Sequence, residues 1–204
     1  MYRNLIATLL LAFPLCATSI NFDDQVTAGG AVQLSNQYAA SDVAISNIYA
    51  AQNFKFNIIP PSAPNYASPF WVDFNPGTIS FVDPTNALVN ATVASVSFTL
   101  VGLTTPAGKP GNYSGATVDA LDLSGNVIAG QSIIIPGVSA ATANQTLTFT
   151  GPIHALRFTH DNTTTGALPI DDLAFGALTP APEPTTLGLL GAGLLLLGFS
   201  RRKR

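Results

Sequence analysis

Aspartates are the residues of this chain whose types and spacing could bind a metal. Asp23-Asp24 follows a short apolar stretch, and Asp171-Asp172 lies within a later one. Adjacent carboxylates repel each other unless a cation lies between them, and Ca²⁺, which takes about six to eight oxygen ligands, suits such a group. If the first and last strands are neighbours, the sequence predicts one structural Ca²⁺ held by Asp24 and by Asp171 or Asp172, with Asp42 as a further ligand. The alternative is solvated aspartates at strand ends.

The residues that could carry out catalysis are sparse. Glu183 is the only glutamate, so a glutamate pair for glycoside hydrolysis is absent. His154 and His160 lie six residues apart, with no third metal ligand at a suitable spacing, and the motifs H-E-x-x-H and G-x-S-x-G are absent. Aspartates in place of the glutamates, or a Ser-His-Asp triad assembled by the fold, stay open as alternatives. The sequence predicts a protein that is not an enzyme.

Aromatic side chains could form a ligand surface. Tyr66, Trp71 and Tyr113 lie in or beside two long loops, and exposed aromatic rings stack on sugars. The alternative for Trp71 is a place in the core, because apolar and polar residues alternate around it.

The elements that must position these residues are strands. In Ser95 to Leu100 every second residue is apolar, which places Val96, Phe98 and Leu100 on one face. Ser124-Gly125-Asn126 predicts a hairpin, Gly151-Pro152 a turn, and the proline-rich stretch 60–69 a long surface loop. Similar patterns predict strands at 20–22, 42–49, 54–58, 70–74, 95–100, 117–123, 127–135, 146–150, 153–159 and 170–176. Without a convincing amphipathic helix, this is an all-β chain, and we expect a β-sandwich with jelly-roll connectivity over residues 20–179.

The charge of this region excludes one class of partner. Residues 20–182 hold three cations, Lys55, Lys109 and Arg157, against ten aspartates, for a net charge of −7. Phosphate binding needs clusters of basic residues, so we expect no nucleic acid partner.

Residues 1–19 have the features of a secretory signal peptide. Arg3 precedes an apolar run over 5–15, and Ala17-Thr18-Ser19 offers small residues for cleavage before Ile20, with cleavage after Ala17 as the alternative. Cys16 is the only cysteine, and the bulky residues before it argue against lipidation. We therefore expect export and removal of the segment by signal peptidase.

Residues 180–204 form a linker, an apolar segment and a basic tail. Pro182-Glu183-Pro184 is followed by sixteen uncharged residues, 185–200, with seven leucines, and then by Arg201, Arg202, Lys203 and Arg204. A helix of that length spans about 24 Å, short of the roughly 30 Å hydrocarbon core, so we expect a short transmembrane helix with the basic tail in the cytoplasm. A simple membrane anchor is the alternative.

The order of these three parts resembles the PEP-CTERM sorting signal. The resemblance implies a Gram-negative bacterium that makes exopolysaccharide, a transient stay in the inner membrane and cleavage near Pro182-Glu183-Pro184 by an exosortase, a membrane-embedded cysteine transpeptidase. It further implies delivery to the cell surface or the extracellular matrix.

Three short motifs, Phe-Asp-Asp at 22–24, Leu-Asp-Leu-x-Gly-Asn at 121–126 and Ile-Asp-Asp-Leu-x-Phe at 170–175, resemble jelly-roll ectodomains of PEP-CTERM proteins. These ectodomains are similar to carbohydrate-binding modules, in which a structural calcium often bridges the first and last strands.

Together these features predict a secreted or surface-sorted, non-enzymatic protein of an exopolysaccharide or biofilm matrix. A secreted hydrolase acting on extracellular polysaccharide is the alternative, and a purely structural adhesin or coat protein is a third.

Overall fold

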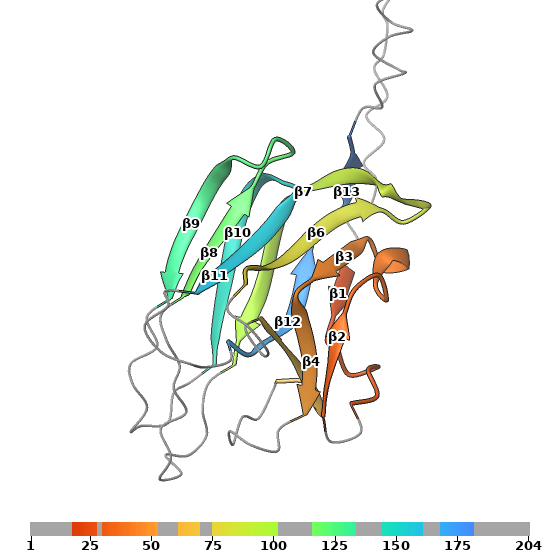
Figure 1. Ribbon diagram of the computed structural model, residues 1–204. Helices are drawn as coiled ribbons and strands as arrows, with labels where there is room; N and C mark the ends of the chain where they lie inside the picture. The colour runs from red at the N-terminus through yellow and green to blue at the C-terminus, as the bar shows by residue number, and fades with distance from the viewer. Residues whose placement is uncertain are drawn as a thin grey trace, which may run out of the picture.

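Thirteen strands make up most of the described chain, which confirms the all-β prediction (Figure 1). This computed structural model describes residues 18–27, 30–52, 61–69, 75–101, 116–133, 144–160 and 168–181. Within these ranges the helical structure is one 3-10 turn, η1 (Ala39–Ser41). No helix of the described part is long and apolar enough to cross a membrane.

The strands pair antiparallel in one continuous array that folds over into two layers (Figure 1). The long strand β7 (Asn86–Leu100) and its hairpin partner β6 (Gly77–Asp83) link the layers. The first layer also holds β2 (Ala31–Leu34), β4 (Ile48–Gln52), β5 (Asn65–Pro69), β12 (Ile170–Phe175) and β10 (Gln145–Ile153), with β1 (Thr18–Ile20) on β12 and β13 (Leu178–Pro180) on β7. The second layer contains β6 with β3 (Val43–Ser46), β11 (Ala155–His160), β8 (Ala116–Leu121) and β9 (Val127–Ile133).

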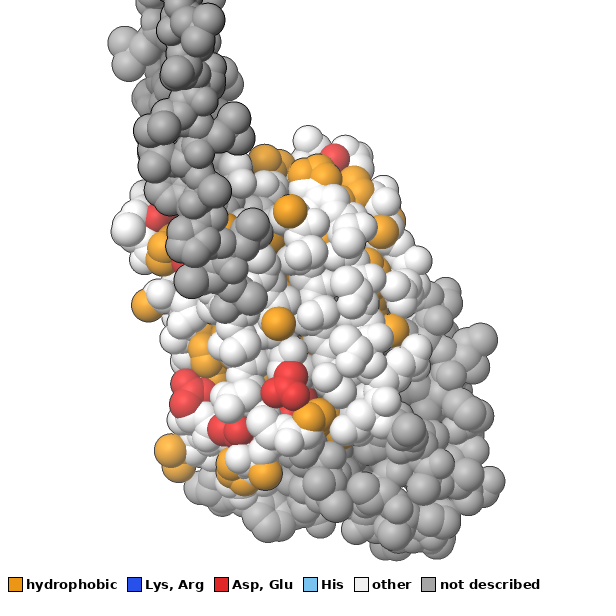
Figure 2. All heavy atoms as spheres, turned by 180° about the vertical axis from the view of Figure 1, so that it is seen from behind, with side chains coloured by type: hydrophobic (Ala, Val, Ile, Leu, Met, Phe, Trp, Pro, Cys, Tyr) orange, Lys and Arg blue, Asp and Glu red, His pale blue; other side chains and the backbone are white. Residues whose placement is uncertain are grey.

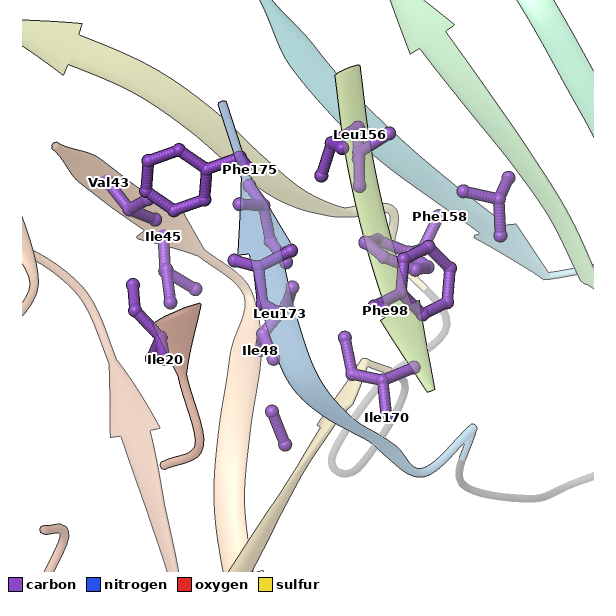
Figure 3. Packing of buried hydrophobic residues seen from close by; sticks show 14 of the residues in the cluster. Ile20, Val43, Ile45, Ile48, Phe98, Leu156, Phe158, Ile170, Leu173 and Phe175 are labelled. Atoms are coloured by element: carbon purple, nitrogen blue, oxygen red, sulfur yellow. The ribbon is translucent and has the colours of Figure 1, made fainter. Parts of the chain in front are cut away.

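Alternation along the strands builds the core between the layers. Val96, Phe98 and Leu100 are buried as the pattern predicts, and Leu147 and Phe149 of the neighbouring strand β10 are buried beside them. Phe98 stacks on Phe149 with ring centroids 6.4 Å apart and meets Phe158 of the other layer edge-on at 5.7 Å. Figure 3 shows Phe98 and Phe158 among side chains from both layers. A sandwich-like packing therefore follows from the period of two in the sequence.

The turn between β8 and β9 confirms the predicted hairpin. Gly125 has φ +81°, a left-handed conformation that favours glycine, and Asp122 accepts backbone hydrogen bonds from Ser124 at 2.8 Å and Asn126 at 2.9 Å. The turn predicted at Gly151-Pro152 is wrong in position, because β10 runs through both residues to Ile153 with a register shift. His154 then makes the connection to β11.

The loop predicted for 60–69 is also wrong in part, because Asn65–Pro69 forms the buried strand β5. Pro64 precedes this strand and Pro69 is its last residue, so the prolines bracket it. The residues between them pair with β4 along the whole of β5, and Ala67 pairs with Ile170 of β12. Proline removes a ladder donor only at its own position, and that position is at the strand end here.

Several predictions lie outside the described residues. These are the strands at 54–58 and 70–74, all but two residues of the signal peptide 1–19, the helix at 185–200 and the basic tail at 201–204. Thr18 and Ser19 are described, and they pair with Phe175 and Ala174 as part of β1. Cleavage after Ala17 would leave this strand whole, whereas cleavage before Ile20 would remove two of its three residues.

Candidate functional site

A buried carboxylate, Asp171, lies where three distant segments of the chain meet. Its side chain has no solvent exposure. One oxygen, Oδ2, accepts hydrogen bonds from the backbone N–H of Ser62 at 3.0 Å and from the Ser62 hydroxyl at 2.8 Å, and Oδ1 accepts one from the N–H of Asp172 at 2.8 Å. The Ser62 hydroxyl also lies 3.4 Å from the carbonyl oxygen of Asn21. The carboxylate thus joins β12 to the segment before β5, and Ser62 of that segment lies beside the loop after β1.

Asn65, the first residue of β5, forms hydrogen bonds to the same loop after β1. Its backbone N–H donates to Asp23 Oδ1 at 2.9 Å, and its side-chain amide nitrogen donates to the carbonyls of Phe22 at 3.1 Å and Gln25 at 2.8 Å. Its side-chain oxygen, Oδ1, is buried and has no hydrogen-bond partner. A buried acceptor without a donor costs free energy unless a donor or a cation fills the place.

Burial sets the electrostatics of this cluster. Loss of solvent raises the pKa of Asp171 to about 6, although the hydrogen bonds from Ser62 and Asp172 oppose the rise. Near neutral pH the group is ionised inside the protein without a cationic side chain paired with it among the described residues. Asp171, Asp23 and the free oxygen of Asn65 are hard oxygen donors, which is the chemistry of a calcium site.

The four aspartates predicted to bind calcium do not gather into one cluster. Among the described residues, no three His, Cys, Asp or Glu side chains lie close enough to hold a metal. Asp24 accepts the hydroxyl of Tyr38, and Asp172 is half-buried beside Asp171. Asp42 lies beside β6, where its carbonyl accepts the N–H of Val82, and burial and the neighbouring Asp83 raise its pKa. Asp171 is therefore the one residue of the predicted set that is central to the cluster.

Sequence reasoning missed Ser62 and Asn65 as cluster residues. Both lie in the proline-rich stretch assigned to a surface loop, so no alternation pointed to burial. The signal that could have found them is a polar residue directly after Pro64, where a strand can begin. The sequence predicts Asp24 of the Asp23-Asp24 pair as the ligand, whereas the structure places Asp23 against Asn65 and Asp24 against Tyr38.

The predicted ligand surface of aromatic residues is wrong for Tyr66. This side chain is fully buried in β5, between β4 and β12, and burial raises its pKa. A ring in that position cannot stack on a sugar. Trp71 and Tyr113 lie outside the described residues.

Beyond the cluster, the last described strand leads into the C-terminal segment. A family model for the PEP-CTERM protein-sorting motif matches residues 180–204. Residues 180–204 are a PEP-CTERM protein-sorting motif. The motif marks the chain for exosortase-dependent sorting to the cell surface, and the exosortase is its processing partner.

The PEP-CTERM motif begins on the folded sandwich. Pro180 is the last residue of β13 and pairs with Ala91 of β7, and the N–H of Ala181 donates to the carbonyl of Asn90 at 2.8 Å. The sequence Pro182-Glu183-Pro184 follows at once. The start of the motif is therefore held against the domain by strand hydrogen bonds.

Solved structures similar to this chain are known at low identity. The K2 cleaved adhesin domain of Lys-gingipain is 11% identical, with a TM-score of 0.46 over 78% of this chain and 99% of that one. The K1 domain from Porphyromonas gingivalis W83 is 12% identical, with a TM-score of 0.42 over 79% and 98%. The enzymatically active domain of bacteriophage CBA120 tailspike protein 4 is 11% identical, with a TM-score of 0.30 over 76% and 21%. No curated protein matches the chain by sequence.

Proposed function

We propose that this chain is a surface-sorted, non-enzymatic protein that binds or builds an exopolysaccharide matrix. The observation that carries the proposal is a sorting motif that continues directly from a folded β-sandwich. In this account a signal peptidase removes the N-terminal segment at the inner membrane of a Gram-negative bacterium. An exosortase then releases the sandwich, for which we expect jelly-roll connectivity, to the cell surface or matrix.

The dispersal of ionisable groups supports a binding role over catalysis. Nδ1 of His154 lies 2.9 Å from the carbonyl oxygen of Ala91, and Arg157 forms an ion pair of 2.7 Å with Asp119. A hydrolase of polysaccharide, the alternative function, needs two carboxylates or a carboxylate and a histidine facing one cleft. In the part of the chain that the structure describes, His154 and Arg157 serve structural contacts instead.

The surface best suited to a polysaccharide is a hydroxyl face on the outside of β7 and β10. Its members are Ser95, Ser97, Thr99, Thr146, Thr148 and Thr150, which pair across the two strands as 146 with 99, 148 with 97 and 150 with 95. The threonines of β10 are exposed. Figure 2 shows that this side is mostly white, with no Lys or Arg colour and with scattered hydrophobic side chains. Hydroxyls donate and accept hydrogen bonds as sugar hydroxyls do, so the face fits a neutral glycan.

The hydroxyl face can be tested by removing its exposed threonines. We expect the triple variant Thr146→Ala, Thr148→Ala, Thr150→Ala to bind exopolysaccharide from the producing strain about tenfold or more weakly, because each lost hydrogen bond contributes about 0.5 to 1.5 kcal/mol. Affinity electrophoresis in gels with that polysaccharide measures the change.

A matched control alters the other layer. Thr78, Thr117 and Thr159 are half-buried threonines of β6, β8 and β11, and their alanine variant should bind as the wild type does. Equal binding by both triple variants and the wild type would exclude the hydroxyl face, and no binding by any protein would favour the purely structural role.

We also propose one structural Ca²⁺ at the Asp171 cluster. Asp171, Asp23 and Oδ1 of Asn65 fit the ion because they supply two carboxylates and a buried acceptor without a partner. Bound there, Ca²⁺ would offset the buried charge and tie the loop after β1 to β5 and β12. The ion would stabilise the folded state and would take no part in catalysis.

A further inference from the structure

Exposed hydrophobic side chains are concentrated in two hairpins. The described residues include five large hydrophobic side chains that are well exposed. Leu88, 93% exposed, lies near the tip of the β6–β7 hairpin, and Leu123, Val127 and Ile128 lie in or beside the β8–β9 turn, while Val26 is elsewhere. Such side chains are unusual when several share one end of a domain, and they suggest a contact surface.

The first hairpin lies beside the point where the chain leaves the sandwich. Ala181 bonds to the carbonyl of Asn90, and Leu88 is two residues from Asn90 toward the hairpin tip. Ala181, the last described residue of the chain, therefore lies beside this hairpin.

Hydrogen bonds place the second hairpin at the same end. The N–H of His154 donates to the carbonyl of Leu121, which immediately precedes the β8–β9 turn, at 2.7 Å. Nδ1 of the same histidine lies 2.9 Å from the carbonyl of Ala91, and Ala91 pairs with Pro180 of β13. Figure 1 shows both hairpins in the upper half of the molecule with β13.

The charges of this end indicate which surface it could contact. Asp83 and Asp122 lie at the two turns, and hydrogen bonds from Thr85 and from Asn126 lower their pKa values, so both are ionised. Arg157, the only cation in the described ranges, pairs with Asp119. An end with exposed apolar tips and carboxylates, and no free cation among these residues, fits a zwitterionic lipid surface better than an anionic one.

We propose that Leu88 and Leu123 rest on the lipid bilayer surface while the PEP-CTERM segment holds the chain in the membrane. The proposal rests on the proposed function and on the membrane insertion of residues 185–200 that the sequence predicts. The two hairpins would then fix how the sandwich stands on the membrane, and would orient Pro182-Glu183-Pro184 toward a membrane-embedded exosortase.

The test places an environment-sensitive NBD label at single cysteines in the chain with its C-terminal segment, in a Cys16→Ser background. The labelled variants are Leu88→Cys and Leu123→Cys, with Val26→Cys as the matched control. Val26 is 84% exposed and lies in the loop of the Asp171 cluster. This cluster is at the end of β12 where the strand begins, and Phe175 is at the other end. The chain is reconstituted into phosphatidylcholine vesicles, and doxyl-labelled lipids quench any label that enters the outer 5 to 10 Å or so of the bilayer.

We expect labels at 88 and 123 to be quenched about twofold or more beyond the label at 26, and anionic lipid to reduce the difference. Equal quenching at all three positions would overturn the proposal. If the fluorescence of the labels at 88 and 123 changes with protein concentration and not with doxyl lipid, the surface contacts a second copy of the chain. That result would also overturn the proposal. Vesicle flotation is measured separately: failure to float contradicts the membrane insertion itself, whereas flotation without quenching contradicts only the contact.

Discussion

Ca²⁺ is expected to raise the melting temperature of the wild-type chain by roughly 5 to 15 °C over EDTA, and the variant Asp171→Asn should lose this response. A ligand present at 100 to 1,000 times its Kd stabilises the folded state by about 2.7 to 4.1 kcal/mol, and 1 kcal/mol shifts the melting temperature of a protein of this size by about 2 to 4 °C. Differential scanning fluorimetry with and without EDTA measures both proteins. The physical reason is that Asp171 is the buried carboxylate of the cluster.

The control for this prediction is Asp172→Asn. Asp172 is the neighbouring residue, but its side chain is only half-buried, so its variant should keep the calcium response. An equal rise of the melting temperature with calcium in Asp171→Asn and in the wild type would contradict binding at Asp171. An equal melting temperature of the wild type in EDTA and in calcium would contradict calcium binding altogether.

The calcium-free protein should also show a distinct pH dependence. The pKa of Asp171 is raised in the folded state to about 6, so the folded state holds this proton more tightly than the unfolded state does. Stability from this group is fully present below about pH 4 and is lost as the pH rises through about 6. In Asp171→Asn this loss is expected to disappear.

Phe98→Ala is expected to lower the free energy of unfolding by about 3 to 5 kcal/mol. Truncating a fully buried phenylalanine removes its hydrophobic transfer energy and leaves a cavity. Phe98 is fully buried and contacts Phe149 of its own layer and Phe158 of the other, so both layers lose packing. The loss is a large part of the roughly 5 to 15 kcal/mol that holds a domain together. Urea denaturation followed by circular dichroism measures it.

Leu88→Ala serves as the comparison for Phe98→Ala. Leu88 is almost wholly exposed, so its truncation should change the free energy of unfolding by less than about 0.5 kcal/mol. A loss below about 1 kcal/mol in Phe98→Ala would mean that the two layers do not pack around this ring.

Alternation predicted the strands whose two faces have different environments. In β7, Val96, Phe98 and Leu100 point into the core and the residues between them point out, so the pattern alone determines the face. The sequence pattern did not predict strand β5, because all its residues are buried and no alternation of buried and exposed positions results. A strand buried on both faces and flanked by prolines has the composition of a loop.

The candidate site could be predicted only in part, because it depends on contacts between distant segments. Asp171 stood out as one of two aspartates within an apolar stretch. Its partner Ser62 is 109 residues away in sequence, and Asn65 reaches Phe22 across 43 residues. No local pattern encodes these separations. The choice of Asp24 over Asp23 depended on which side chain faces Asn65 and which faces Tyr38, and only the fold determines that.

Intact mass of the mature chain, in strains with and without the exosortase, tests exosortase-dependent processing. We expect the strain with the exosortase to yield a chain shortened near Pro182-Glu183-Pro184, lacking the twenty residues 185–204, and the strain without it to retain them. The same spectra give the N-terminus, and so decide between cleavage after Ala17 and cleavage before Ile20. An intact C-terminus in both strains would make the segment an ordinary anchor and would contradict exosortase-dependent sorting.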